Sequence, residues 1–382
     1  DIRWFAETVG KDHKVMLMHN YALARCASAD NIPQLFMTMG AMGGHMGKSG
    51  HACGGAYKTY AGAGGPALVK FGETGLPATK NALADTMPEP LMWQCIREGR
   101  YNSTGAAYGV NFNAEDIKET EFKWLNIEGR NTLQTAVGLS DAREAIQKLD
   151  FVTDLAYTFD TSAAYADIVL PCATEWERVG GFAGHQRSRE TVVVYSRVTE
   201  PLWEAKTEFE IGRMLAARLG MDPDELWPIT EEQAFFNQIV GCTYVDAAGE
   251  EKPLVTITAD DIAKWGVDAE PQEGDIALDD FLSAGCYTVK RAEGDGYSYI
   301  GYKDFVDDPE ANPRESASGK LEIYCQYKGD MLNSMGYSPA GTFKPYPTYV
   351  ASPEGREGMF ADRQIGGAAS EYPLIVYNPH YL

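Results

Sequence analysis

The residues with the most chemistry to offer lie where predicted strands end. Gly129-Arg130-Asn131 follows the apolar run 122–127, and Glu177 follows the apolar run 168–170. In open α/β sheets, ligands bind outside the carboxyl ends of the strands. An arginine fork suits a phosphate there, and an asparagine amide both donates and accepts hydrogen bonds. The pattern predicts an anion or nucleotide site, with a solvated turn as the other interpretation of residues 129–131.

The two carboxylates around the run 168–170 each admit two interpretations. Asp167 directly precedes the run and either caps a turn or binds a ligand. Glu177 lies beyond the strand end, where a ligand contact and a surface ion pair are both open. Sequence spacing leaves both choices undecided.

A glycine-rich run at residues 40–50 contains the triplet Gly47-Lys48-Ser49. The P-loop pattern G-x-x-x-x-G-K-[ST] follows a strand and opens a helix, whereas this run ends a predicted helix. We therefore reject nucleotide hydrolysis. The seven cysteines are expected to be scattered buried or free thiols, and Cys53, just beyond the run, is the only one to test for reactivity. No C-x-x-C, H-E-x-x-H or G-x-S-x-G pattern occurs in the sequence.

The elements that must position these residues alternate between strand and helix, which predicts an α/β fold with parallel strands. Short apolar runs predict strands at 15–18, 122–127, 151–156, 168–170, 254–257 and 320–324. Helical spacing predicts helices at 31–42, 91–98, 142–149, 208–219 and 259–265. Residues 279–284 fit either a strand or a helical turn. Asp30 and Thr258 are the expected N-caps of two helices.

The amino-acid composition excludes some classes of binding partner. The 382 residues include 33 basic and 55 acidic side chains, a net charge of −22. A nucleic-acid-binding surface needs a basic footprint, so no nucleic acid is expected as a partner. No apolar run reaches the roughly 18 residues of a membrane-spanning helix. Both ends of the sequence lie within predicted elements, and we expect a piece of a longer protein.

Several motifs occur in the order found in one known family. Residues 162–171 resemble the T-A-x-x-A-D-I-V-L-P signature of the dimethyl sulfoxide reductase family of molybdopterin oxidoreductases. Residues 43–50 are similar to its G-N-I-G-x-P-G turn, and residues 129–131 to its G-x-N-P turn. Residues 318–324 resemble its S-G-K-I-E-I-Y run. The resemblance spans essentially the whole chain and is strongest to the anaerobic dimethyl sulfoxide reductase catalytic subunits.

The resemblance implies a cofactor, molybdenum bis(molybdopterin guanine dinucleotide), cradled by two Rossmann-like units of parallel sheet with flanking helices. The implied domains are residues 1–121, part of the first unit; 122–345, the second unit with a less regular insertion; and 346–382, a linker and the start of a C-terminal β-barrel domain. The implied cofactor-binding residues are Asn20, Arg25, Gly47, Gly129, Arg130, Asn131, Ser162, Asp167 and Glu177. A guanine-binding aspartate of some members aligns with Ala156.

The implied reaction is oxygen-atom transfer, the reduction of a small substrate such as an S- or N-oxide in anaerobic respiration. The family's cysteine motif for a 4Fe–4S cluster and its molybdenum ligand are not in this sequence. We therefore expect this fragment alone to bind no intact cofactor and to be inactive. For the full-length protein, the resemblance implies an iron–sulfur electron-transfer subunit and a membrane anchor as partners, on the periplasmic or extracellular side.

Two other classes of protein compete with this interpretation. A non-catalytic scaffold or binding module of the same fold is the main alternative. The presence of a cluster motif and a metal ligand in the full-length protein would discriminate between them. An NAD-dependent dehydrogenase is disfavoured, because no G-x-G-x-x-G follows a predicted strand.

Overall fold

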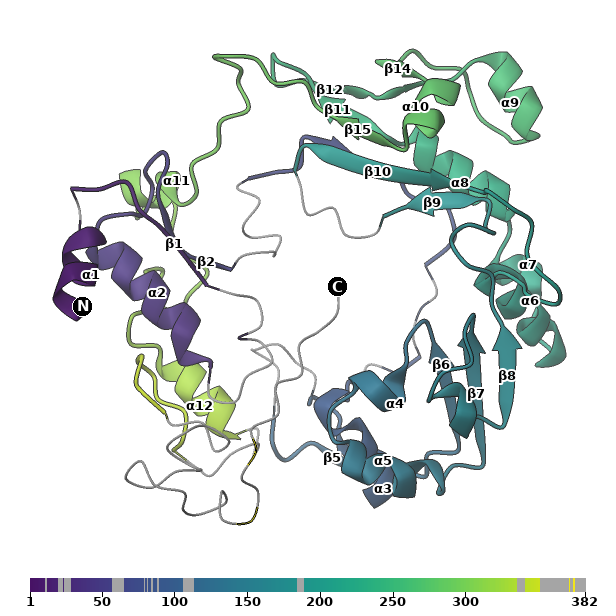
Figure 1. The fold of residues 1–382 in the computed structure, drawn as a ribbon, viewed down its shortest axis with the longest axis horizontal. Coiled ribbons are helices and arrows are strands. Elements are labelled where there is room, and N and C mark those ends of the chain that lie inside the picture. The colour runs from purple at the N-terminus through teal and green to yellow at the C-terminus, as the bar shows by residue number, and fades with distance from the viewer. Residues whose placement is uncertain are drawn as a thin grey trace. The chain divides into compact units, whose positions relative to one another are not determined.

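The structure is a computed structural model of the chain, and the fold is drawn in Figure 1. It describes residues 1–10, 12–19, 23, 29–56, 65–78, 80, 82–83, 85–87, 89–105, 113–183, 189–334, 341–350, 371 and 374. The chain divides into two compact units. Asp1–Gly65 and Tyr299–Leu382 form the first, and Pro66–Ser298 forms the second.

The first unit is built on two parallel strands, β1 (Met16–His19) and β2 (Ala52–Ala56). The helix between them in sequence, α2 (Asn31–Met42), packs closely on β2. Gly40 permits this packing, because a Cβ there would lie 2.1 Å from the Cβ of Cys53. The other helices of this unit are α1 (Ile2–Thr8), α11 (Lys303–Asp307) and α12 (Gln326–Ser334).

Two predictions in the first unit were wrong. Residues 320–324 form bends and irregular backbone, not a strand: the N–H of Ser318 donates to Glu322 (3.1 Å) and the hydroxyl of Ser316 donates to the carbonyl of Lys320 (2.6 Å). Such local bonds satisfy backbone groups that a strand would pair with a neighbour. Asp30 precedes α2 but makes no capping bond, since its carboxylate accepts from Lys328 at 3.0 Å.

The second unit contains a parallel sheet in the order β6-β7-β8 (Figure 1). The strands are β6 (Trp124–Glu128), β7 (Phe151–Ala156) and β8 (Ile168–Pro171). Helices α4 (Thr132–Thr135) and α5 (Leu139–Ile146) connect β6 to β7, and the 3₁₀ helix η4 (Ala163–Tyr165) connects β7 to β8. A small apolar core joins α5 to α3 (Met92–Glu98) through Trp93, Ile96 and Ala145.

Most other strands of the second unit pair antiparallel. They form the sheets β15-β10-β9 (Cys286–Thr288, Thr191–Ser196 and Gly180–Phe182), β12-β11-β3 (Glu251–Pro253, Thr243–Val245 and Val69–Lys70) and β4-β5 (Arg100–Asn102 and Ile117–Glu119). The exception is the parallel pair β13 (Val255–Thr256) and β14 (Ile276–Ala277).

The C-terminal helices of the second unit are α6 (Glu208–Arg218), α7 (Pro223–Leu226), α8 (Glu231–Val240), α9 (Ala259–Trp265) and α10 (Leu278–Ala284). The 3₁₀ helix η3 (Glu89–Leu91) lies earlier in the unit. The larger core of the unit packs α8, α9 and α10 with the strands β3, β9, β10, β13 and β15. Phe236, Ile239 and Phe281 are fully buried in this core. The prediction for α9 is confirmed in detail, since Thr258 forms a capping box with Asp261 and Gly266 ends the helix in the left-handed conformation.

The fold is therefore mixed α/β, with parallel and antiparallel sheets together. The domain boundary predicted between residues 121 and 122 falls inside the second unit, and it stays a prediction. So does the barrel start within 346–382, which lies mostly outside the described residues. In the part of the chain that the structure describes, no helix is long and apolar enough to cross a membrane.

Candidate functional site

The carboxyl edge of the β6-β7-β8 sheet brings three chemistry-bearing loops together. In the strand register, Glu128 lies opposite Leu155, and Leu155 lies opposite Leu170. The three strands thus end almost level. The loops that start at residues 129, 157 and 172 emerge side by side, as the sequence predicted for parallel strands.

The first loop presents an open glycine turn and a cation. Gly129 has φ +63°, and none of the described atoms lies within 4 Å of the position that its Cβ would take. The guanidinium of Arg130 is about half exposed; it pairs with Glu89 and donates to the hydroxyl of Thr135 at 3.2 Å. Both partners are at the surface, so these contacts are weak and an anion at Arg130 would displace them at little cost.

Ser162 holds the first loop to the second. Its side chain is fully buried, and its hydroxyl donates to Asn131 Oδ1 (2.9 Å) and accepts from the N–H of Leu133 (3.0 Å). Asn131 precedes α4 but makes no capping bond of its own, so Ser162 caps this short helix from 29 residues away. The amide of Asn131 also donates to Gln134 at 2.7 Å. Ser162 thus fixes the loops at the edge of the sheet.

Asp167 lies at the opposite end of the sheet. Its carboxylate accepts from the backbone N–H of Val152 at 2.8 Å, and its own N–H donates to the carbonyl of Val152 at 2.8 Å. Val152 is near the start of β7 and Asp167 precedes β8, so both belong to the amino edge. The structure does not bring Asp167 together with the other predicted residues, and its carboxylate bonds to the start of β7.

Glu177 anchors the third loop from within. Only 6% of the residue is exposed; its carboxylate accepts from the N–H and the hydroxyl of Thr174 (2.8 and 2.9 Å) and from the N–H of Leu202 (3.1 Å). The bonds from Thr174 and then Leu202 lower the pKa of Glu177, although burial opposes them. Because both oxygens are occupied by backbone donors, Glu177 positions the segment around residue 202.

The remaining predicted residues belong to the first unit. Gly47 has φ +69°, and a Cβ there would lie 2.9 Å from the Cβ of Val306, so a side chain would collide with α11. Asn20 and Arg25 lie outside the described residues. Burial raises the pKa of the Cys53 thiol, which is 5% exposed, so Cys53 fits the expected buried thiol and not a reactive one.

Sequence reasoning missed three residues in β7 or just beyond its carboxyl end. Asp154 in β7 is 2% exposed, and its Oδ2 has no hydrogen-bond partner among the described residues. Burial and then the Asp160 carboxylate raise the pKa of Asp154. Tyr157 and Phe159, just beyond β7, are 62% and 76% exposed. The signal was present as an aspartate inside an apolar run and two aromatics directly after it.

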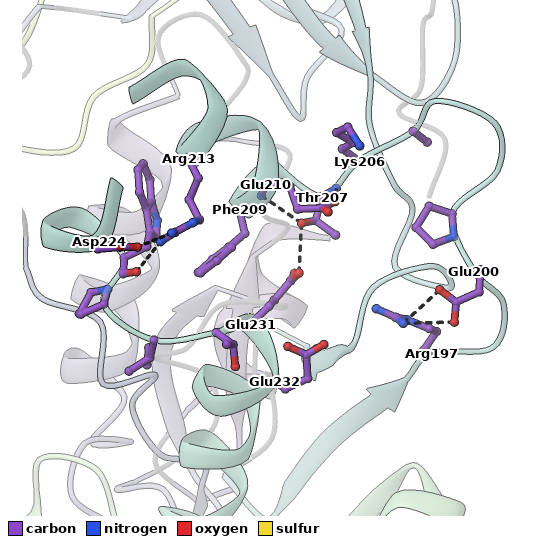
Figure 2. A pocket seen from close by; sticks show the side chains of 16 residues that line it. Arg197, Glu200, Lys206, Thr207, Phe209, Glu210, Arg213, Asp224, Glu231 and Glu232 are labelled. Atoms are coloured by element: carbon purple, nitrogen blue, oxygen red, sulfur yellow. Dashed lines mark hydrogen bonds and ion pairs between the residues drawn. The ribbon is translucent and has the colours of Figure 1, made fainter. Parts of the chain in front are cut away.

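A separate cleft of about 610 Å³ lies where α6 and α8 begin (Figure 2). Its charged side chains mostly satisfy one another: Arg197 pairs with Glu200 at 3.2 Å, and Arg213 pairs with Asp224 at 2.5 Å. The hydroxyl of Thr207 donates to Glu231 at 3.1 Å. The predicted site residues lie elsewhere, so this cleft is not the candidate site. Within the described residues, no three His, Cys, Asp or Glu side chains are arranged to hold a metal ion.

Comparison with known proteins shows the class of protein to which these loops belong. The family model of molybdopterin oxidoreductases matches residues 4–218. The chain belongs to the molybdopterin oxidoreductase family, which confirms the resemblance found in its sequence.

Three relatives show how far this similarity extends. The dimethyl sulfoxide/trimethylamine N-oxide reductase of Cereibacter sphaeroides is 24% identical over 373 residues, covering 96% of this chain and 40% of that protein. Dimethyl sulfoxide reductase DmsA of Escherichia coli (strain K12) is 23% identical, covering 80% and 33%. Respiratory nitrate reductase subunit alpha of Haloferax mediterranei is 28% identical, covering 55% and 23%. The chain spans 40% or less of the length of each relative.

Proposed function

We propose that the carboxyl edge of β6-β7-β8 holds one guanine dinucleotide arm of molybdenum bis(molybdopterin guanine dinucleotide). The observation that carries the proposal is the combination of groups at this edge. An open left-handed glycine, an exposed arginine and two exposed aromatic rings follow two neighbouring parallel strands, at Gly129, Arg130, Tyr157 and Phe159.

These groups fit the parts of a nucleotide diphosphate. Arg130 and the backbone beyond Gly129 would bind phosphate oxygens, since a glycine turn lets main-chain N–H groups approach an anion. Tyr157 and Phe159 would stack on the guanine ring. The Oδ2 atom of Asp154, which has no hydrogen-bond partner among the described residues, would accept from an N–H of the guanine base. In the first unit, the predicted contacts of Asn20, Arg25 and Gly47 with the cofactor belong to the same proposal.

The chain's own residues would bind and orient the cofactor. Ser162 and Glu177 hold the loops at fixed positions, so that little ordering is needed when the cofactor binds. When bound, the molybdenum group supplies the two-electron oxygen-atom chemistry, and the protein contributes position and electrostatics. We infer that the substrate of the full-length protein is a small S- or N-oxide, in keeping with the names of two relatives.

The remaining proposals concern the full-length protein. One relative is named as subunit alpha, which supports a multi-subunit enzyme. The partners proposed from the resemblance are an iron–sulfur electron-transfer subunit and a membrane anchor, on the periplasmic or extracellular side, with a 4Fe–4S cluster in the catalytic subunit. The chain by itself is expected to have no turnover.

Guanosine diphosphate tests the proposal because it carries the ring and phosphates of one cofactor arm. Calorimetry on the 382-residue chain should show binding that Arg130→Gln weakens about tenfold, the worth of one charge-assisted hydrogen bond. Arg143→Gln, which removes an exposed arginine from α5, is the matched control and should leave the affinity unchanged. An equal loss in both variants, or no binding by the unmodified chain, would refute the proposal.

A further inference from the structure

Two histidines of the glycine-rich loop share a hydrogen bond in the first unit. The Nδ1 atoms of His45 and His51 lie 2.9 Å apart, and their rings stack with an interplanar angle of 23°. His45 is 1% exposed, and its Nε2 lies 2.7 Å from the carbonyl of Val9, just after α1. The pair thus connects both ends of the loop 43–51 to the end of α1.

The contacts fix which nitrogen carries each proton at neutral pH. A carbonyl only accepts, so Nε2 of His45 must carry a hydrogen that it donates to Val9. The Nδ1 of neutral His45 is then the acceptor, and the Nδ1 of His51 is the donor. A first added proton goes to the other nitrogen of His51 and leaves this bond intact. A second proton can only go to Nδ1 of His45, where it removes the acceptor.

The surroundings of the pair oppose added positive charge. The ammonium of Lys48 lies 3.4 Å from where a Cβ of Gly44 would be, and the side chain of Lys14 lies 3.8 Å from the same position at Gly50. Burial, then His45, Lys48 and Lys14, lower the pKa of His51. Among the described residues, His45, Lys48 and Lys14 are the titratable groups whose charge lowers the pKa of His51.

We propose that the His45–His51 pair is a pH-sensitive contact that holds the loop 43–51 against the end of α1 at neutral pH and releases the loop on acidification. With both rings charged, two N–H groups face each other beside two ammonium groups. In the released loop, water reaches the two rings, and they bind protons more readily than in the closed loop. Closure therefore loses stability as pH falls below the ordinary histidine range near 6.5.

Tight packing makes release of the pair a change in the whole loop. A Cβ on Gly43 would lie 2.7 Å from the ring of His45 and 2.8 Å from the carbonyl of Val9, so ring, loop and helix end are in close contact. The loop also contains Gly47, packed on Val306. If the proposed function is right, acidification loosens one of the cofactor's contact segments; only this consequence rests on that function.

Hydrogen exchange on the 382-residue chain tests the proposal without any nucleotide or cofactor. The reporter is the backbone N–H of His45, which donates to the carbonyl of Gly40 at 2.8 Å. Its protection factor should fall at least tenfold between pH 7 and pH 5, while amides of β7 keep theirs. In His51→Gln the fall should be under threefold, because an amide does not titrate and can donate to or accept from His45.

The matched control is His13→Gln, which removes an exposed histidine and should behave like the unmodified chain. If His51→Gln lost protection as the unmodified chain does, or if the unmodified chain lost none, the proposal would be wrong. Nitrogen-15 NMR of the histidine rings gives a second measure without a substitution. At neutral pH, Nδ1 of His51 should carry a proton and Nδ1 of His45 should not, and the reverse assignment would contradict the proposal.

Discussion

The two edges of the β6-β7-β8 sheet use polar side chains in opposite ways. At the amino edge, the carboxylate of Asp167 accepts a hydrogen bond from the backbone of β7. At the carboxyl edge, Arg130, Tyr157 and Phe159 extend toward solvent with weak contacts or large exposed areas. The most recognisable motif of the sequence, residues 162–171, spans both edges. Its aspartate assembles the sheet, and the groups that we propose for cofactor binding lie in the adjacent loops.

Residues at the carboxyl edge have two different roles: some hold the loops in place, and others extend toward solvent. Ser162 and Glu177 are buried, with their polar atoms occupied by neighbouring loops. Asp154 is buried too, yet its Oδ2 has no partner among the described residues. A buried polar group without a partner costs stability, and the proposed ligand would supply the missing partner.

The largest effect that would sharpen this comparison is expected for Ser162→Ala. The substitution leaves the N–H of Leu133 and an oxygen of Asn131 without their buried partner, which should cost about 1–3 kcal/mol of unfolding free energy. Denaturant titration measures it, with the exposed Ser140→Ala as the control, expected within about 0.5 kcal/mol of the unmodified chain. A loss no larger than the control's would show that Ser162 does not hold the loops.

A loss of about 1 kcal/mol is expected for Asp167→Ala, because one charge-assisted bond at the surface is removed. Asp167→Asn should lose less, since its carbonyl still accepts from Val152. Guanosine diphosphate affinity should be unchanged in both variants if the two edges have separate roles. A large change in affinity with unchanged stability would place Asp167 in the binding site.

Trp203 offers a stabilising change beside the segment that Glu177 anchors. It has φ +52° and is 95% exposed, so an L-residue occupies a backbone conformation that favours glycine while its ring packs on little. Trp203→Gly should raise the unfolding free energy by about 0.5–1 kcal/mol. Leu202→Gly, at a neighbour without positive φ, should lower it; a loss of stability in Trp203→Gly would mean that the ring makes contacts that matter.

The smallest expected effect is a change in pH dependence for Asp154→Asn. The pKa of Asp154 is raised in the folded chain, so its protonated form is favoured there, and its contribution to stability is lost as pH rises above the usual aspartate range. The unmodified chain should therefore gain stability relative to Asp154→Asn as pH falls from 7 toward 4. Parallel stability curves for the two proteins would show that Asp154 is not strained by burial.

Local signals in the sequence predicted much of the fold. The helix at 259–265 has a capping threonine and a terminal glycine, and both lie where expected because their bonds are made within the helix. The strand predicted at 320–324 failed, because alternation specifies a face but provides no partner strand. Likewise β10 pairs with β15 about a hundred residues away, which no local pattern encodes.

The candidate site was predictable in position more than in role. Strand ends and a glycine-arginine-asparagine turn in the sequence were enough to locate the carboxyl edge. The roles depended on distant partners: Ser162 bonds to Leu133, and Glu177 bonds to Leu202. Asp167 was assigned to the site with its motif, although the parallel register puts it at the other edge.

Photocrosslinking with 8-azidoguanosine diphosphate tests the central claim most directly, because it reports where the base lies on the chain. The main adducts are expected in the segment 157–165 beyond β7, and excess guanosine diphosphate should suppress them. Adducts concentrated around the cleft of Arg197, Arg213 and Glu231, with none beyond β7, would contradict it.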